Sequence, residues 1–102
     1  MTELGERSGM ATSYGAIGEN EQLRGNLDAA EQLSNQALMM AKELGMTKVM
    51  AEVHYDLARL ERKRNNPELA QQHYNSAHQI FQQLGAAKYL ERIEREWHNP
   101  DF

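Results

Sequence analysis

A Leu-Gly pair occurs three times at an interval of 40 residues, at Leu4-Gly5, Leu44-Gly45 and Leu84-Gly85. Aligned with itself at this offset, the chain has 15 identical pairs among 62, whereas ordinary residue usage gives about one identity in twenty. A period of this length is typical of stacked supersecondary units, each of which buries its apolar face against its neighbours. The repeat therefore constrains the fold of this 102-residue chain more than any other feature.

Each repeat is expected to contain two helices. The first runs from about Gly9 to Arg24 and ends at Gly25. Asn26 is expected to begin the second, with its side-chain oxygen accepting a backbone N–H as an N-cap. Gly45 is expected to end that helix, because glycine adopts the left-handed C′ conformation at little cost. The second helix carries apolar residues at spacings of three and four: Ala30, Leu33, Ala37, Leu38, Ala41 and Leu44.

The second repeat follows the same plan. Its first helix has an apolar face of Val49, Val53, Leu57 and Leu60, and its second one of Leu69, Ala70, Tyr74, Ala77, Ile80, Phe81 and Leu84. Between them, Asn65-Asn66-Pro67-Glu68 supplies a turn, a cap, a proline at the first helical position and an acid in the first turn. A fifth helix is expected from about Ala87 to His98, stopped by Pro100, with Trp97 covering the end of the last apolar layer.

These elements predict an all-α fold, an antiparallel helix-hairpin solenoid in one domain over residues 1–102. Repeat 1 covers about 9–45 and repeat 2 about 49–85, and a C-terminal capping helix covers about 87–98. Glu3-Leu4-Gly5 matches Glu43-Leu44-Gly45 and reads as the tail of a helix whose body is absent. We therefore expect the chain to be a fragment of a longer array.

Composition excludes several classes of function. There is no cysteine for a disulfide or thiolate site, which fits a cytoplasmic location. The net charge of −4 disfavours nucleic-acid binding, and no apolar run approaches the length of a membrane span. No catalytic set or phosphate loop is evident, so neither enzymatic activity nor a cofactor is expected. The four histidines lie on different helices or five residues apart, which argues against a metal site; His73 and His78 are expected to be partly buried against the fifth helix.

Aligned in this register, the repeats resemble the tetratricopeptide repeat, with its aromatic-x2-aliphatic-small, Ala-x3-aromatic and Ala positions. The first repeat reads Tyr14-x2-Ile17-Gly18-x2-Glu21, Ala30-x3-Ser34 and Ala37, and the second His54-x2-Leu57-Ala58-x2-Glu61, Ala70-x3-Tyr74 and Ala77. The small residues allow helix backbones to approach closely. Because that family usually repeats every 34 residues or so, the period here resembles the long-period subclass of kinesin light chains.

The resemblance implies a noncatalytic protein-interaction scaffold, an adaptor whose first helices line a concave groove for a peptide or partner helix. In the family's register, the groove positions are Thr12, Gly15, Ala16, Glu19, Gln22 and Leu23 in repeat 1, and Glu52, Tyr55, Asp56, Arg59, Arg62 and Lys63 in repeat 2. Arg92 and Arg95 extend the row. We single out Tyr55, Arg59, Arg62, Lys63, Arg92 and Arg95 as candidate ligand-binding residues. Their charges would suit an acidic segment or a C-terminal carboxylate.

Two alternatives stay open. The basic residues can instead be an ordinary solvated face, balanced by Asp56, Glu94 and Glu96. The chain can also act as a self-association module, a homodimer through an open N-terminal end where Met10, Tyr14 and Leu33 would expose apolar surface. A regulatory domain of a larger protein is a further possibility.

Overall fold

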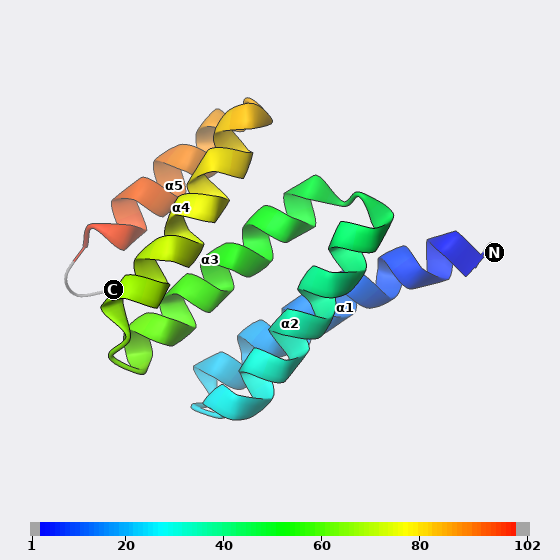
Figure 1. Ribbon diagram of the computed structural model, residues 1–102, viewed down its shortest axis with the longest axis horizontal. Helices are drawn as coiled ribbons and strands as arrows, with labels where there is room; N and C mark the ends of the chain where they lie inside the picture. The colour runs from blue at the N-terminus through cyan, green and yellow to red at the C-terminus, as the bar shows by residue number, and fades with distance from the viewer. Residues whose placement is uncertain (1–2, 100–102) are drawn as a thin grey trace.

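The computed structural model describes residues 3–99, with side chains from residue 5 onward, and this part of the chain contains five α-helices and no strand (Figure 1). The helices are α1 (Glu3–Leu23), α2 (Leu27–Leu44), α3 (Thr47–Lys63), α4 (Pro67–Gln83) and α5 (Ala87–Trp97). Each packs antiparallel to the next, and α1 also contacts α3. The predicted all-α hairpin solenoid is confirmed.

The turns between helices repeat with the sequence. Gly45 ends α2 in the left-handed conformation (φ 69°), as predicted, and Met46 N–H donates to the Ala41 carbonyl at 2.9 Å. Gly25 and Asn65, which are 40 residues apart, also have positive φ, at 86° and 63°. Asparagine tolerates this region better than most residues with a side chain. The two repeats therefore turn in the same way after their first helices.

Asn26 occupies the expected N-cap position before α2, but the expected capping hydrogen bond to its side-chain oxygen is not formed. Its Nδ2 instead donates to Glu21 Oε2 at 2.6 Å, and Asn66 Nδ2 donates to Glu61 Oε2 at 2.7 Å one repeat later. Each asparagine thus ties the start of a second helix back to the first helix, where a carboxylate is a stronger acceptor than water.

The start of α1 differs from expectation. The helix begins at Glu3 rather than near Gly9, so residues 3–5 continue into α1 and are not the tail of a separate helix. Glycine permits a left-handed turn but does not impose one, and a helix tolerates it at a cost of roughly 1 kcal/mol. The Leu-Gly pair at Leu4-Gly5 therefore does not end a helix as its two counterparts do. Pro100, expected to stop α5, lies outside the described residues.

Small residues lie where the helices meet, as predicted. Ala30, Ala37, Ala58 and Ala77 are fully buried, and Ala70 is nearly so. Among the glycines of α1 from Gly9 onward, Gly18 is the most tightly packed, since an added Cβ would lie 2.9 Å from Ser34 Oγ. These contacts set the spacing within both hairpins, because helices without bulky side chains at the interface pack closely.

Helix α5 closes the array over repeat 2. Trp97 is buried and stacks on Tyr74 with ring centroids 4.7 Å apart. Phe81 stacks on Tyr89 in the same cluster, at 5.1 Å. Trp97 is therefore part of the last apolar layer, as expected. Leu69 and Leu84, expected on the apolar face of the second helix of repeat 2, are instead 41% and 47% exposed.

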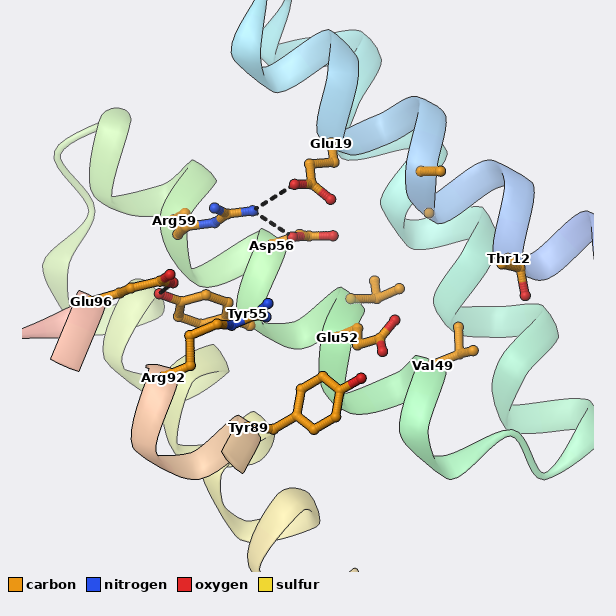
Figure 2. Close-up of a pocket in the computed structure, with 13 residues that line it drawn as sticks. Thr12, Glu19, Val49, Glu52, Tyr55, Asp56, Arg59, Tyr89, Arg92 and Glu96 are labelled. Carbon is orange, nitrogen blue, oxygen red and sulfur yellow. Dashed lines mark hydrogen bonds and ion pairs between the residues drawn. The ribbon is translucent and has the colours of Figure 1, made fainter. Parts of the chain in front are cut away.

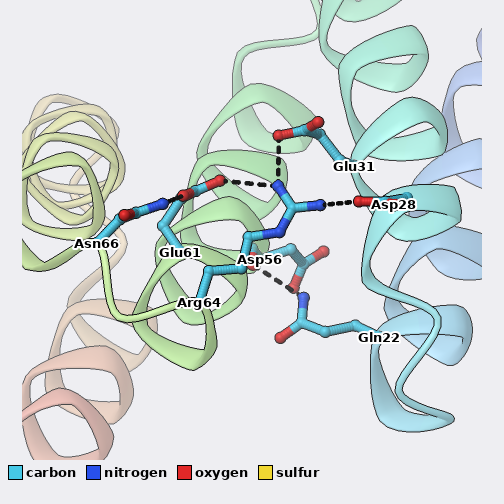
Figure 3. Close-up of polar contacts among 7 residues, drawn as sticks. All are labelled: Gln22, Asp28, Glu31, Asp56, Glu61, Arg64 and Asn66. Atoms are coloured by element: carbon cyan, nitrogen blue, oxygen red, sulfur yellow. Dashed lines mark hydrogen bonds and ion pairs between the residues drawn. The ribbon is translucent and has the colours of Figure 1, made fainter.

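An ion-pair network joins the two repeats between the start of α2 and the end of α3 (Figure 3). Arg64 follows α3, and its guanidinium lies 2.6 Å from Asp28 and 2.7 Å from Glu31, both on α2. It also lies 3.3 Å from Glu61. One side chain therefore links the end of α3 to the start of α2.

Within residues 3–99, none of the helices combines the length and apolar character that crossing a bilayer requires.

Candidate functional site

The concave side of the array holds a cavity of about 420 Å³ between α1, α3 and α5 (Figure 2). The lining comes from the first helix of each repeat, α1 and α3, and from α5. The second helices, α2 and α4, pack against the first helices and contribute no lining residue. The cavity is lined by Thr12, Gly15, Ala16, Glu19, Val49, Glu52, Val53, Tyr55, Asp56, Arg59, Tyr89, Arg92 and Glu96. This is the place where the family resemblance puts a groove.

Most of the expected groove positions line this cavity, four of them from α1 (Thr12, Gly15, Ala16 and Glu19) and four from α3 (Glu52, Tyr55, Asp56 and Arg59). Two other expected positions on α1 lie elsewhere. Gln22 is buried and donates to the backbone carbonyl of Asp56 at 3.0 Å, so it joins α1 to α3. Leu23 is 71% exposed at the end of its helix and is not among the lining residues.

The six candidate binding residues do not form one row. Tyr55, Arg59 and Arg92 line the cavity, but Arg62, Lys63 and Arg95 do not. Arg62 instead lies over the Trp97 ring, 3.4 Å from its centroid, and donates to the Trp97 carbonyl at 3.0 Å. Lys63 and Arg95 are exposed. The predicted basic stripe is therefore not one surface: Arg59 and Arg92 line the cavity, Arg62 packs on Trp97, and Lys63 and Arg95 lie outside the cavity.

The centre of the cavity is an ion-pair triad. Arg59 Nη2 lies 2.7 Å from Asp56 Oδ1 and 3.6 Å from Glu19 Oε1, so it bridges α3 and α1. Burial raises the pKa of Asp56 to about 7, an effect that Arg59 opposes and Glu19 reinforces. The Arg59 side chain is only 21% exposed. Asp56 is therefore the near counter-ion of Arg59, and Glu19 a more distant one.

Aromatic residues form the wall nearest α5. Tyr55 is buried and donates to Glu96 Oε1 at 2.8 Å, which joins α3 to α5. Burial, together with this hydrogen bond, raises the pKa of Tyr55 well above its usual range, so the phenol stays protonated. Arg59 and Arg92 approach the rings of Tyr55 and Tyr89, at 5.1 and 5.5 Å from the centroids. Two exposed cations border this wall: Arg92, which lines the cavity, and Lys48, whose Nζ lies 4.9 Å from the Tyr89 centroid.

Four lining residues were not among the expected groove positions: Val49, Val53, Tyr89 and Glu96. Their sequence pattern does carry a signal. Val49, Val53 and Tyr89 belong to apolar stripes, which ordinarily indicate core positions, and Glu96 is a counter-ion by its sequence pattern alone. Since Tyr89 follows Val49 by 40 residues, the repeat register places both at the same position of successive first helices.

The histidines are arranged differently from the expectation. His78 Nε2 lies 2.7 Å from Glu94 on α5, in agreement with the predicted contact. His73 instead faces α3, where its Nδ1 lies 3.1 Å from His54 Nδ1. In residues 3–99, no three side chains of the histidine, aspartate or glutamate type converge on a point that could hold a metal ion.

A family model described as tetratricopeptide repeat matches residues 9–83, well over half of the chain. The match covers the four helices of both hairpins from Gly9 onward. A search of the curated proteins found no match. A search of the solved structures found none either.

Proposed function

The chain belongs to the tetratricopeptide repeat family, and from this membership we propose that it is a noncatalytic scaffold that binds a protein segment in the cavity between α1, α3 and α5. Repeats of this family generally mediate protein–protein interactions. The long-period subclass expected from the 40-residue spacing stays a prediction, as do the adaptor role and a cytoplasmic location.

The observation that carries the proposal is the shape and composition of the cavity. It is about 420 Å³ in volume, and its lining combines small residues on α1 with polar and aromatic side chains on α3 and α5. Gly15 and Ala16 leave room on the α1 side, where larger side chains would fill the space. Such concave surfaces, with a few convergent polar groups, are typical binding sites. An extended peptide or a helix from a partner fits this description.

Filling the cavity tests the proposal. Random peptides displayed on phage would be selected on the purified chain, and the enriched peptides measured by fluorescence anisotropy. We expect Ala16→Trp to weaken their binding at least about tenfold, because the indole occupies the space that the peptide needs. Ala29→Trp is the matched control, since Ala29 is exposed on α2 and outside the cavity. Enriched peptides that bind Ala16→Trp as well as the wild type would contradict the proposal.

A second candidate function, self-association, is favoured by the outer face of α1. Met10 and Ile17 are each 46% exposed and border a hollow of about 490 Å³ beside Tyr14. Exposed apolar patches often mark protein contacts. We propose a second copy of the chain as the occupant in this case. Sedimentation over a range of concentrations tests it: a dimer that Ile17→Glu dissociates supports the proposal, and a monomer at all concentrations removes it.

A further inference from the structure

We propose that the segment bound in the cavity carries basic side chains that pair with Glu19 on α1 and with Glu52 on α3; this inference rests on the function proposed above. The first support is the balance of charges in the lining. Carboxylates outnumber guanidinium groups there even without Asp56, whose pKa burial raises to about 7, because Glu19, Glu52 and Glu96 stand against Arg59 and Arg92. A cationic partner complements this surface, whereas an anionic one meets net repulsion.

The second support is that the cavity's central cation is already engaged. Arg59 pairs with Asp56 at 2.7 Å and lies over the Tyr55 ring, and its Nε is buried without a hydrogen-bond partner among the described residues, where a ligand would have to enter the packed wall to reach it. A partner carboxylate that approached Arg59 would have to displace these contacts. Arg92 is the remaining cation of the lining. Within the lining, an acidic segment therefore has one exposed charge to bind, on α5 alone.

The third support is that two of the carboxylates keep capacity for a further cation. Glu19 and Glu52 have side chains 47% and 42% exposed, so their oxygens are open to a partner. Their contacts within the protein are long, at 3.6 Å from Glu19 to Arg59 and 3.9 Å from Glu52 to Lys48. Ion pairs this long and this exposed contribute little, so a partner's lysine or arginine can compete with them.

The positions of the two carboxylates define where the basic side chain binds. Glu19 belongs to α1 and Glu52 to α3, and both line the cavity (Figure 2). Lysine is the simpler probe because its ammonium group is a compact charge with three donors. A segment lying along the cavity would then place its remaining residues against the aromatic wall of Tyr55 and Tyr89.

The test compares labelled peptides of equal length in which serine alternates with lysine, glutamate or glutamine. We expect the lysine peptide to bind the wild-type chain most tightly in anisotropy titrations, and added salt to weaken its binding. Replacing Glu19 and Glu52 together by glutamine should weaken the binding of the lysine peptide by about threefold to tenfold, because exposed ion pairs are individually weak. The control is Glu68→Gln with Glu91→Gln, which changes the net charge equally at two exposed positions outside the cavity.

The outcomes separate this inference from the proposed function. Tighter binding of the glutamate peptide, or equal losses in the Glu19/Glu52 and Glu68/Glu91 variants, would overturn the basic-segment inference. No binding of any charged peptide, while Ala16→Trp still weakens the display-selected peptides, would also overturn it and leave the cavity as the binding site. Selected peptides that ignore Ala16→Trp would instead remove the proposed function itself.

Discussion

The Nδ1 atoms of His54 and His73 lie 3.1 Å apart across the interface between α3 and α4, so one imidazole donates a hydrogen bond to the other. This hydrogen bond requires that one of the two Nδ1 atoms carries no proton, because two N–H groups would otherwise face each other. Lys42 adds a further positive charge near His54, whereas Glu61 favours the charged form of His73. This pair is the histidine contact that we did not expect from the sequence.

The histidine pair predicts a contribution to stability that is lost in mild acid. Burial, with the charge of His73, lowers the pKa of His54 to about 4 from 6.5, and burial lowers that of His73 too. Between these values the two histidines bind more protons in the unfolded chain than in the folded chain, so their contribution to stability falls as the pH is lowered from about 6.5 to 4. Asp56 acts in the opposite direction over this range, because burial raises its pKa to about 7. For His54 alone, we expect a loss of up to about 2–3 kcal/mol over this range.

Urea unfolding at several pH values measures this effect. Replacing His54 by Tyr and His73 by Leu installs the residues that lie 40 positions earlier, Tyr14 and Leu33. The double variant should lack the histidine contribution to the pH dependence and should therefore lose less stability than the wild type as the pH is lowered. Replacing the exposed His98 by glutamine should leave it unchanged. Equal pH dependence in the double variant and the wild type would contradict the prediction.

Gly18→Ala should destabilise the protein although alanine is the better helix former. A Cβ at Gly18 would lie 2.9 Å from Ser34 Oγ and 3.3 Å from the Ser34 backbone nitrogen, so α1 and α2 would have to separate. We expect a loss of about 1–3 kcal/mol from this overpacking. At Gly9, also in α1, nothing lies within 4 Å of such a Cβ. Gly9→Ala should therefore stabilise the chain, by roughly 0.5–1 kcal/mol, and chemical denaturation that ranks the two variants the other way would refute the argument.

Arg64→Gln should destabilise the junction between repeats more than the same change at Arg24, its counterpart 40 residues earlier. Arg64 pairs with three carboxylates and has a side chain 21% exposed, whereas Arg24 has a side chain 73% exposed and a contact to Glu21 at 3.5 Å. We expect a loss of about 1 kcal/mol at position 64 and much less at position 24. Thermal melts at low and high salt check this, because screening should narrow the difference between the variants. Equal effects at the two positions would count against the network.

Trp97→Ala should cost about 3–5 kcal/mol, the usual range for removing a buried aromatic side chain. The indole stacks on Tyr74 and lies under Arg62, so its loss detaches α5 from repeat 2. Because each unit of a repeat protein contacts only its neighbours, hydrogen exchange should speed up in α4 and α5 before α1 and α2. Trp97→Phe keeps a stacking ring and should lose less. Uniform loss of protection along the chain would contradict this local view.

Much of the fold could be predicted from the sequence. The 40-residue period, the apolar spacings and Gly45 located the helices to within a few residues, except at the start of α1. The predicted start near Gly9 was wrong because Gly5 permits a turn without imposing one. The exposure of Leu69 and Leu84 was missed because an apolar stripe shows which face of a helix is apolar, but not how much of it a neighbour covers.

Less of the candidate site could be predicted. The repeat register brought Glu19, Tyr55, Asp56 and Arg59 to one cavity, as expected, because first helices lie side by side. The register did not reveal that Arg62 packs on Trp97 or that Arg59 is held by Asp56 and Glu19. A long side chain has many rotamers, and its partner is set by helices distant in the chain.

The sequence by itself determined the helices, their order and the small residues between them, because helix formation and capping depend on residues a few positions apart. Only the tertiary structure decided which charged side chains line the cavity and which, such as Arg62, contact other parts of the protein. Arg59 and Glu19 are 40 residues apart, and Arg62 and Trp97 are 35 apart. Such pairs form only once packed helices bring their side chains within reach, since Coulomb attraction in water is weak beyond a few ångströms.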